Sequence, residues 1–147
     1  VTLIDSAIAD NPENVDLWVG RGRIFYALKN YDESIASFKK VVELKPDLFE
    51  GNYYLGVFYT IKADEMNKVM NEKQYSSQTA YDTDLKEVNA VYMDAVPWFE
   101  KAYELKKDDV NTLDFLKSIC FRLRDEEGMM DKYNKYNTLL KEAKGEE

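Results

Sequence analysis

Apolar residues recur at steps of three and four along most of the chain, which is the spacing of one face of an α-helix. Residues 16–30 and 31–46 form two such stretches, joined by a short polar turn, and Pro46 ends the second. Gly22 stands in the middle of the first stretch, where it costs about 1 kcal/mol relative to alanine. The pattern therefore predicts a helical hairpin, and Gly22 predicts that a neighbouring helix passes too close for a side chain.

The same spacing returns further along the chain. Asn52 follows Trp18 by 34 residues and opens a second copy, whose second half is "AVPWFEKAYELKKDD" at residues 95–109, and a weaker third copy follows. Arg21 stands where an apolar residue is expected, so its side chain must reach the surface or find an acidic partner. The recurring positions are Trp18, Arg21, Gly22, Phe25, Ser34, Phe38 and Pro46, then Asn52, Leu55, Gly56, Tyr59, Ala95 and Phe99, then Leu113, Leu116, Lys117, Cys120, Met129 and Tyr133.

This pattern resembles the tetratricopeptide repeat, whose motif W-x2-L-G-x2-Y…A-x3-F…P spans about 34 residues. The resemblance implies an all-α fold, a right-handed α-α superhelix of about three helical hairpins with the second one elongated. It divides the chain into the second helix of a preceding repeat (1–12), three repeats (15–48, 49–109 and 110–143) and a frayed tail (144–147). Because Val1 falls inside an amphipathic pattern, we expect further sequence upstream.

The second repeat is longer than the period by 27 residues, which form an insertion at about 64–93. We expect both helices of this repeat to run on and form a projecting arm, which would reach about 18 Å beyond the stack. The polar stretch 71–87 would be its tip, with Asp84 capping the returning helix and Pro97 kinking it. The arm is either a decorated loop without function or a contact surface for a partner or a second copy. Its expected seam is Leu55, Tyr59, Met66 and Val69 on one helix and Leu85, Val88, Tyr92, Ala95, Phe99 and Ala102 on the other.

In tetratricopeptide arrays the first helix of each hairpin lines a concave groove, which commonly holds a peptide or a partner's helix. The resemblance assigns this role to the matching positions here. Tyrosine hydroxyls and Arg23 in this set suit a moderately polar ligand, although the residues could also cover an unoccupied groove. The positions are Asp16, Val19, Arg23 and Tyr26, then Glu50, Tyr53, Val57 and Thr60, then Asn111, Asp114, Ser118 and Arg122.

One subtype of the family grips the C-terminal carboxylates of a chaperone, and its clamp is not matched here. The Lys and Asn positions of that clamp in the first repeat hold Val19 and Arg23. Its later Asn and Lys/Arg positions hold Tyr54, Asn111 and Phe115.

Composition contributes mainly exclusions. A net charge of −8 argues against nucleic acid or an anionic membrane as a partner, and no segment has the ~20 apolar residues that cross a bilayer. The chain has no histidine, which excludes imidazole-dependent catalysis and metal sites, and we expect no cofactor and no metal. Its one cysteine, Cys120, is expected to be a core residue beside Leu116 and Ile119.

The sequence thus predicts a non-catalytic scaffold that binds a protein or peptide in the concave groove. The alternative is a structural or oligomerising module, in which the arm or the N-terminal helix pairs with a second copy. An enzyme is not expected, since no nucleophile, base or metal constellation is present. The residues do not fix the compartment, and only the resemblance to exported bacterial repeat proteins favours the periplasm.

Overall fold

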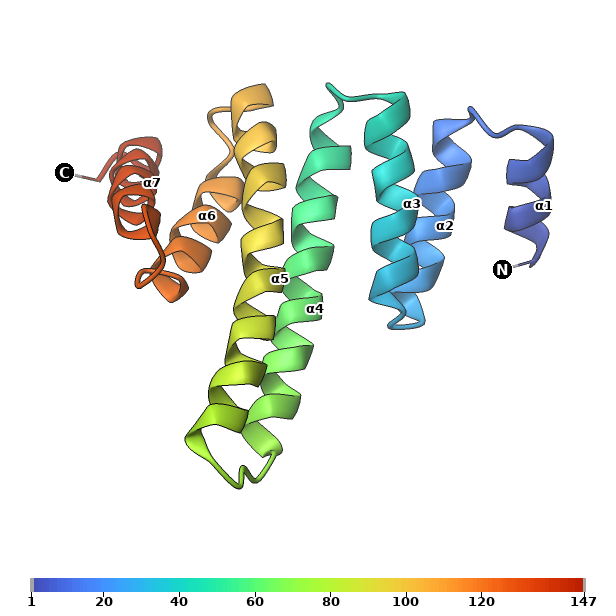
Figure 1. The fold of residues 1–147 in the computed structure, drawn as a ribbon. Coiled ribbons are helices and arrows are strands. Elements are labelled where there is room, and N and C mark those ends of the chain that lie inside the picture. Colours follow the sequence, from blue (N-terminus) through green and yellow to red (C-terminus); the bar gives the residue numbers. More distant parts are fainter. Residues whose placement is uncertain (1, 147) are drawn as a thin grey trace.

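The computed structural model describes residues 2–146, and every regular element within them is an α-helix. Helices that follow one another in the chain pack side by side, first within hairpins and then between them, and they build the single row seen in Figure 1. This is an α-α superhelical solenoid, as the sequence predicts. The helices are α1 (Thr2–Asp10), α2 (Val15–Ala27), α3 (Tyr31–Leu44), α4 (Phe49–Glu72), α5 (Gln78–Leu105), α6 (Val110–Arg122) and α7 (Met129–Lys144).

Short polar side chains begin several of these helices. Asn14 accepts a hydrogen bond from the backbone N–H of Asp16 at 3.0 Å, and Asp109 accepts one from the N–H of Thr112 at 2.8 Å. Asn30 and Ser77 cap α3 and α5 in the same way. Each cap satisfies an N–H that has no partner inside its helix, and such a cap typically stabilises the fold by ~1 kcal/mol.

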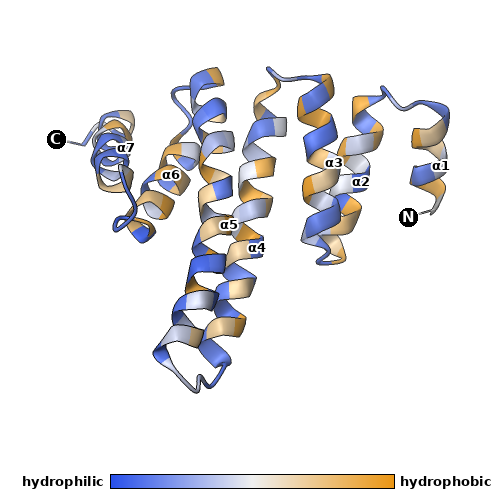
Figure 2. Cartoon of the chain, in the orientation of Figure 1, coloured by the Kyte–Doolittle hydropathy of each residue, from blue (hydrophilic) through white to orange (hydrophobic). Residues whose placement is uncertain are grey.

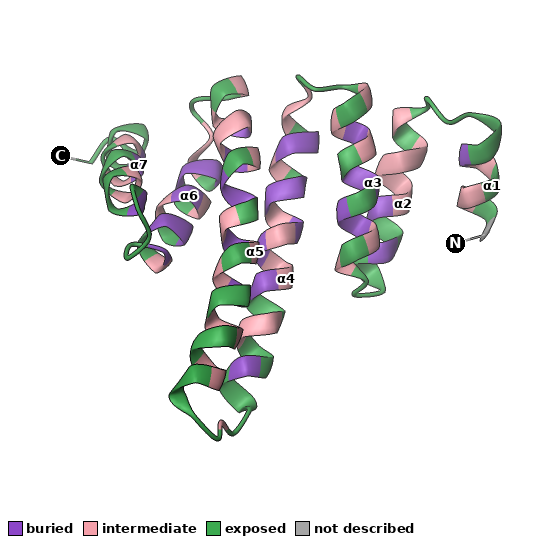
Figure 3. Cartoon of the chain, in the orientation of Figure 1, coloured by how far each residue is buried: buried purple, intermediate pink, exposed green. Residues whose placement is uncertain are grey.

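The core runs along the row as two clusters of buried apolar side chains. One joins α2, α3 and α4 around Phe38 and Leu55, and the other joins α4 to α7 around Phe99 and Leu116. Leu55 and Leu116 are fully buried, and Trp18 packs against the first cluster while its indole N–H donates to the Pro12 carbonyl at 2.7 Å. Figure 3 shows buried positions along the facing sides of these helices. The recurring apolar positions therefore bury a shared seam between stacked hairpins.

Two glycines allow the closest helix contacts. A Cβ on Gly22 would lie 2.5 Å from a ring carbon of Phe38, and a Cβ on Gly56 would lie 2.9 Å from the ring of Phe99. These distances are shorter than real Cβ atoms permit, so a side chain at either position would push the paired helices apart. The close passage that Gly22 predicts is thus confirmed, and the equivalent residue of the next hairpin has the same role.

Arg21 finds acidic partners, which is one of the two outcomes expected for a charged residue at its position. Its guanidinium donates to Asp5 of α1 at 2.9 Å and to Glu33 of α3 at 2.7 Å, and it lies over the ring of Phe25. A third bond runs to the Ser37 hydroxyl at 2.8 Å. The charged residue in the apolar position therefore ties three helices together.

The helices α4 and α5 have 24 and 28 residues, against 13 or 14 in α2 and α3, and they project together beyond their neighbours (Figure 1). The projecting part is the arm, and its tip is mostly hydrophilic (Figure 2). At the tip the Asp84 carboxylate accepts hydrogen bonds from the Lys73 ammonium at 2.9 Å and the Tyr75 hydroxyl at 2.8 Å. These bonds lower the pKa of Asp84.

Two details of the expected arm are wrong. Val69, expected in the seam, is 64% exposed, and Met70 is buried in its place. Asp84, expected to cap the returning helix, lies inside α5, because Ser77 caps that helix seven residues earlier. The helix α5 also runs on through Pro97 without ending.

Val1 and Glu147, the first residue of the predicted leading helix and the last of the predicted tail, lie outside the described residues. The repeat boundaries stay predictions. None of the helices among residues 2–146 combines the length and apolar character that a membrane span requires.

Candidate functional site

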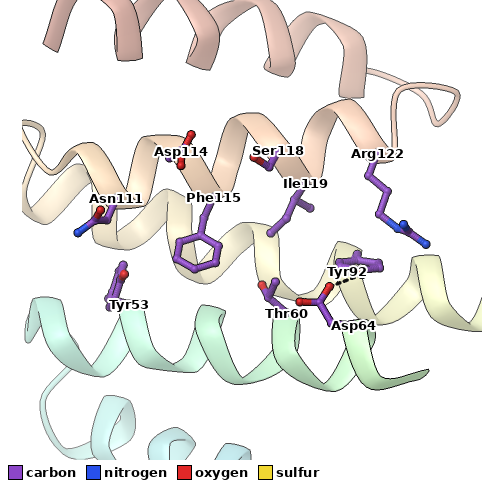
Figure 4. Close-up of a pocket in the computed structure, with 10 residues that line it drawn as sticks. All are labelled: Tyr53, Thr60, Asp64, Tyr92, Asn111, Asp114, Phe115, Ser118, Ile119 and Arg122. Carbon is purple, nitrogen blue, oxygen red and sulfur yellow. Dashed lines mark hydrogen bonds between the residues drawn. The ribbon is translucent and has the colours of Figure 1, made fainter. Parts of the chain in front are cut away.

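A pocket of about 630 Å³ lies between α4 and α6, with α5 running behind them (Figure 4). We call it the α4–α6 groove. The helix α4 contributes one wall, and successive turns of α6 contribute the other because residues three and four apart share a helix face. The groove is lined by Tyr53, Thr60, Asp64, Tyr92, Asn111, Asp114, Phe115, Ser118, Ile119 and Arg122.

The floor of the groove is aromatic. The ring of Phe115 stacks on that of Phe99, with centroids 4.8 Å apart and planes 12° from parallel. Tyr53 meets both rings edge-on at 5.9 and 6.1 Å. Burial raises the pKa of Tyr53, so its hydroxyl stays protonated and can donate a hydrogen bond at neutral pH. The floor therefore combines apolar area with one polar group, an arrangement typical of sites that bind protein side chains.

Charge gathers at the end of the groove nearest the arm. The Tyr92 hydroxyl donates a hydrogen bond to the Asp64 carboxylate. The Arg122 guanidinium lies 4.3 Å from the centroid of the Tyr92 ring, and its Nη2 donates to Asn67 Oδ1 at 2.8 Å. Burial and the bond to Asp64 raise the pKa of Tyr92, so this hydroxyl also stays neutral.

The rim of the groove presents polar groups that are free to bind. Asn111, Asp114 and Ser118 are exposed, and within the described residues their side chains make no hydrogen bond with the rest of the protein. Thr60 differs, since its hydroxyl donates to the Gly56 carbonyl of its own helix at 2.9 Å. A bound segment would therefore find an amide, a carboxylate and a hydroxyl along one edge.

The structure separates the predicted groove positions into groups. Tyr53, Thr60, Asn111, Asp114, Ser118 and Arg122 meet in the α4–α6 groove. Arg23, Tyr26 and Val57 line a smaller pocket of about 290 Å³ between α2 and α4.

The other predicted groove positions line neither pocket. Asp16 and Glu50 are exposed in the first turns of their helices, and Val19 packs against the core of the first hairpin.

Sequence reasoning missed four residues of the groove. Phe115 and Ile119 lie on the face of α6 that carries Asn111, Ser118 and Arg122, so helical spacing alone could have found them. Asp64 and Tyr92 belong to the arm. A repeat pattern carries no signal for them, because the arm has no counterpart in the other repeats.

Cys120 is fully buried in the core cluster that joins α4 to α7, and burial raises the pKa of its thiol to about 11, which disfavours the nucleophilic thiolate. The core role predicted for Cys120 is thus confirmed. Among residues 2–146, no group of three or more Asp, Glu or Cys side chains is arranged to hold a metal ion.

Comparisons with known proteins agree with this architecture. Residues 22–60, from the middle of α2 to the middle of α4, match the family model described as "TPR repeat". A comparison with curated protein sequences finds no match. Among solved structures, the chain is similar to one titled "MamA MSR-1 C2", with a TM-score of 0.58 and 19% identity. That similarity covers 94% of this chain and 64% of the other, so the chain spans less than two thirds of that structure.

Two more distant structures also match. "Crystal structure of MamA" has a TM-score of 0.39 and 19% identity, covering 97% of this chain and 85% of the other. "Crystal structure of PilW, widely conserved type IV pilus biogenesis factor" has a TM-score of 0.35 and 16% identity, covering 97% and 67%. At these TM-scores neither structure is evidence about function, and the first structure shows only that the fold is shared. The chain therefore carries a tetratricopeptide repeat at residues 22–60, within an α-α solenoid of the kind that such repeats form.

Proposed function

We propose that this protein is a non-catalytic scaffold that binds a peptide or protein segment in its concave groove, with the α4–α6 groove as the principal site. Stacked helical repeats commonly use such extended surfaces to bind other proteins. The observation that carries the proposal is the pocket of about 630 Å³, with its aromatic floor and with rim side chains that make no hydrogen bond to the described residues. Apolar pockets with a few convergent polar groups are the usual form of a binding site.

The lining indicates what the bound segment carries. An apolar side chain fits against Tyr53, Phe115 and Ile119, where it leaves water. Hydrogen-bond donors of the segment, or a basic side chain, fit the carboxylates of Asp64 and Asp114. The partner is therefore an amphipathic segment, either extended or helical.

Capture from an extract of the source cell tests the proposal. The chain is the bait, and mass spectrometry identifies what it retains. Ser118→Arg places a long charged side chain on the exposed rim, so we expect the captured protein to be lost. The matched control is Asn134→Arg, which adds the same charge at an exposed position of α7 away from the groove. Equal capture by both variants would contradict binding in this groove.

Self-association through the arm is a second candidate, favoured by one observation. Val69 is 64% exposed and, with Met66, Met70 and Val88, lines a pocket of about 390 Å³ on the arm. Such an apolar patch suits contact with another apolar surface.

A further inference from the structure

A second polar pocket lies where the end of α6 meets the arm. It has a volume of about 500 Å³ and is distinguished by its amide and guanidinium groups. We call it the arm corner and define it by Asn67, Asn71, Asn89, Arg122 and Arg124. One carboxylate, that of Asp125, lines the same pocket, so two guanidinium groups face one acidic group here in a chain of net charge −8.

Two atoms in the arm corner are buried without a hydrogen-bond partner. They are Arg122 Nε, a donor, and Asn89 Oδ1, an acceptor. Leaving such a group unpaired costs ~1–3 kcal/mol, and more when the group is charged, so most buried polar atoms in proteins are paired. Besides these two, the described residues contain one more orphan of this kind, Asn52 Oδ1, in another part of the fold. Both a donor and an acceptor are thus unsatisfied in one pocket.

Within the described residues Arg122 forms no ion pair, although the carboxylates of Asp64 and Asp125 line the two pockets that it borders. Its Nη2 is bonded to the neutral amide of Asn67. Arg21 shows the contrast, because two carboxylates neutralise its guanidinium. Arg124 likewise lacks an ion pair, and its Nη1 donates to the Phe121 carbonyl at 3.0 Å. A partly buried guanidinium with an unused Nε–H is prepared for an acceptor, and a carboxylate forms the strongest bond of this type.

We propose that the arm corner binds a carboxylate of the segment that occupies the α4–α6 groove, with Arg122 as its principal ligand. Arg122 lines both pockets, so a segment that leaves the groove towards the arm passes this side chain. Because Arg122 Nε and Asn89 Oδ1 are buried, the segment must shift the Arg122 side chain to reach them. The carboxylate then accepts from Arg122 Nε, and a neighbouring peptide N–H of the segment donates to Asn89 Oδ1. This inference rests on the proposed function, and it adds the chemistry of the ligand. The carboxylate comes either from a chain terminus or from an acidic side chain.

Nitrogen-15 NMR of the arginine Nε–H groups tests the proposal directly on the unmodified chain. The first probe is N-acetyl-alanyl-alanine, which carries a terminal carboxylate, and the second is N-acetyl-glutamic acid α-amide, which carries only a side-chain carboxylate. The control probe is N-acetyl-alanyl-alanine amide, which carries none. We expect the Arg122 Nε–H signal to shift and saturate with a carboxylate probe, while that of Arg21, which two carboxylates already neutralise, stays unmoved. The probe that binds more tightly identifies the source of the carboxylate.

An unmoved Arg122 signal, or equal shifts with the amide probe, would overturn the proposal. Because this measurement uses no variant, it stands even if a substitution at Arg122 destabilises the protein.

Variants separate this inference from the proposed function. Arg122→Gln removes the charge and the Nε–H, and we expect the affinity for the captured partner to fall roughly tenfold or more. Arg122→Lys keeps the charge without the Nε–H and should recover only part of the affinity. Lys86→Gln removes one charge from an exposed arm position outside the pocket and should change nothing. If Ser118→Arg abolishes capture but Arg122→Gln does not weaken it, the carboxylate inference fails while groove binding stands.

Discussion

The Arg21 guanidinium of α2 donates a hydrogen bond of 2.9 Å to the Asp5 carboxylate of α1. The guanidinium is largely buried, with 17% of the Arg21 side chain exposed, whereas 43% of the Asp5 side chain remains exposed. Water therefore screens the pair on one side, and its contribution falls well below that of a buried ion pair. Burial lowers the pKa of Arg21 and its two acidic partners more than offset this, so the net change in its pKa is upward.

The Arg21 cluster predicts a measurable coupling between α1 and the rest of the array. Arg21→Ala should lower the free energy of unfolding by ~1–3 kcal/mol, because it removes bonds to two carboxylates and one hydroxyl. The double variant with Asp5→Ala should lose less than the sum of the two single variants, as measured by urea denaturation. Arg23→Ala, exposed on the same helix, is the control and should change the stability by less than ~0.5 kcal/mol. If the losses of the two single variants add up to that of the double variant, the contact between Arg21 and Asp5 contributes nothing to stability.

The paired glycines predict a reversal of helix propensity. Alanine normally stabilises a helix by ~1 kcal/mol relative to glycine, but Gly22→Ala and Gly56→Ala should each destabilise the protein by ~1–3 kcal/mol because the new methyl group meets a buried ring. Gly20→Ala is the matched control on α2. Its Cβ would meet only the terminal methyl of Ile4 at 3.1 Å, which can move, so the change should be neutral or stabilising. Thermal denaturation measures all three, and a rise in Tm for Gly22→Ala would disprove the close contact.

Cys120 should report unfolding through its reactivity. The thiol is fully buried and burial raises its pKa to about 11, so alkylation by iodoacetamide at neutral pH should require opening of the fold. We expect the reaction to be slower in the native protein than in urea by roughly a hundredfold or more, because exposing a core thiol requires an opening that costs much of the free energy of unfolding. Mass spectrometry follows the reaction. Rapid native labelling would place Cys120 outside the core.

Tyr136 should make the protein less stable in alkali. Its hydroxyl donates to Glu100 at 2.9 Å, and burial followed by this bond raises its pKa above that of a free tyrosine. The group thus contributes stability that is present below the ordinary tyrosine pKa of about 10 and is lost as the pH rises towards the folded value. Urea denaturation across this range should show a falling free energy of unfolding. Compared with the unmodified chain, the decrease of the free energy of unfolding with pH should be shallower in Tyr136→Phe. It should be the same in Tyr26→Phe, because Tyr26 is exposed.

The arm makes a separate prediction about self-association. If the apolar patch around Val69 pairs two copies, the chain is a dimer at micromolar concentration and Val69→Lys is a monomer. Light scattering after size-exclusion chromatography measures the mass of each. Lys86→Gln, on the arm but outside the patch, should leave the mass unchanged. A monomeric unmodified chain would remove this second candidate function.

The fold could be predicted because its repeats bury one helix face with a fixed spacing. Phe25, Leu55 and Leu116 hold that spacing and are buried. Of the two outcomes expected for Arg21, the surface or an acidic partner, the structure shows the second. The seam of the arm was harder to predict. The apolar pattern of α4 breaks at Lys62, and beyond the break the rotation of the helix about its axis decides which residues face α5. An error of one residue there exchanged Met70 for Val69.

The groove could be predicted only in part, for a different reason. Family positions place side chains along the first helix of each hairpin, and Ser118 and Asn111 among them line the α4–α6 groove. They say nothing of Tyr92, which enters from a second helix because that helix is unusually long. The unpaired Nε of Arg122 is a property of packing, and no pattern of residue types reveals it.

The helix α4 is continuous from Phe49 to Glu72, so one rod serves as the wall of the groove and as one half of the arm. The helix has no break between these residues at which the arm could move independently of the groove wall. We therefore expect a partner that binds the tip of the arm to change how Tyr53 and Asp64 face α6, and with this the affinity of the groove for its segment. Because such coupling between two binding sites is reciprocal, binding of a segment in the groove should change the affinity of the tip for its partner by the same factor.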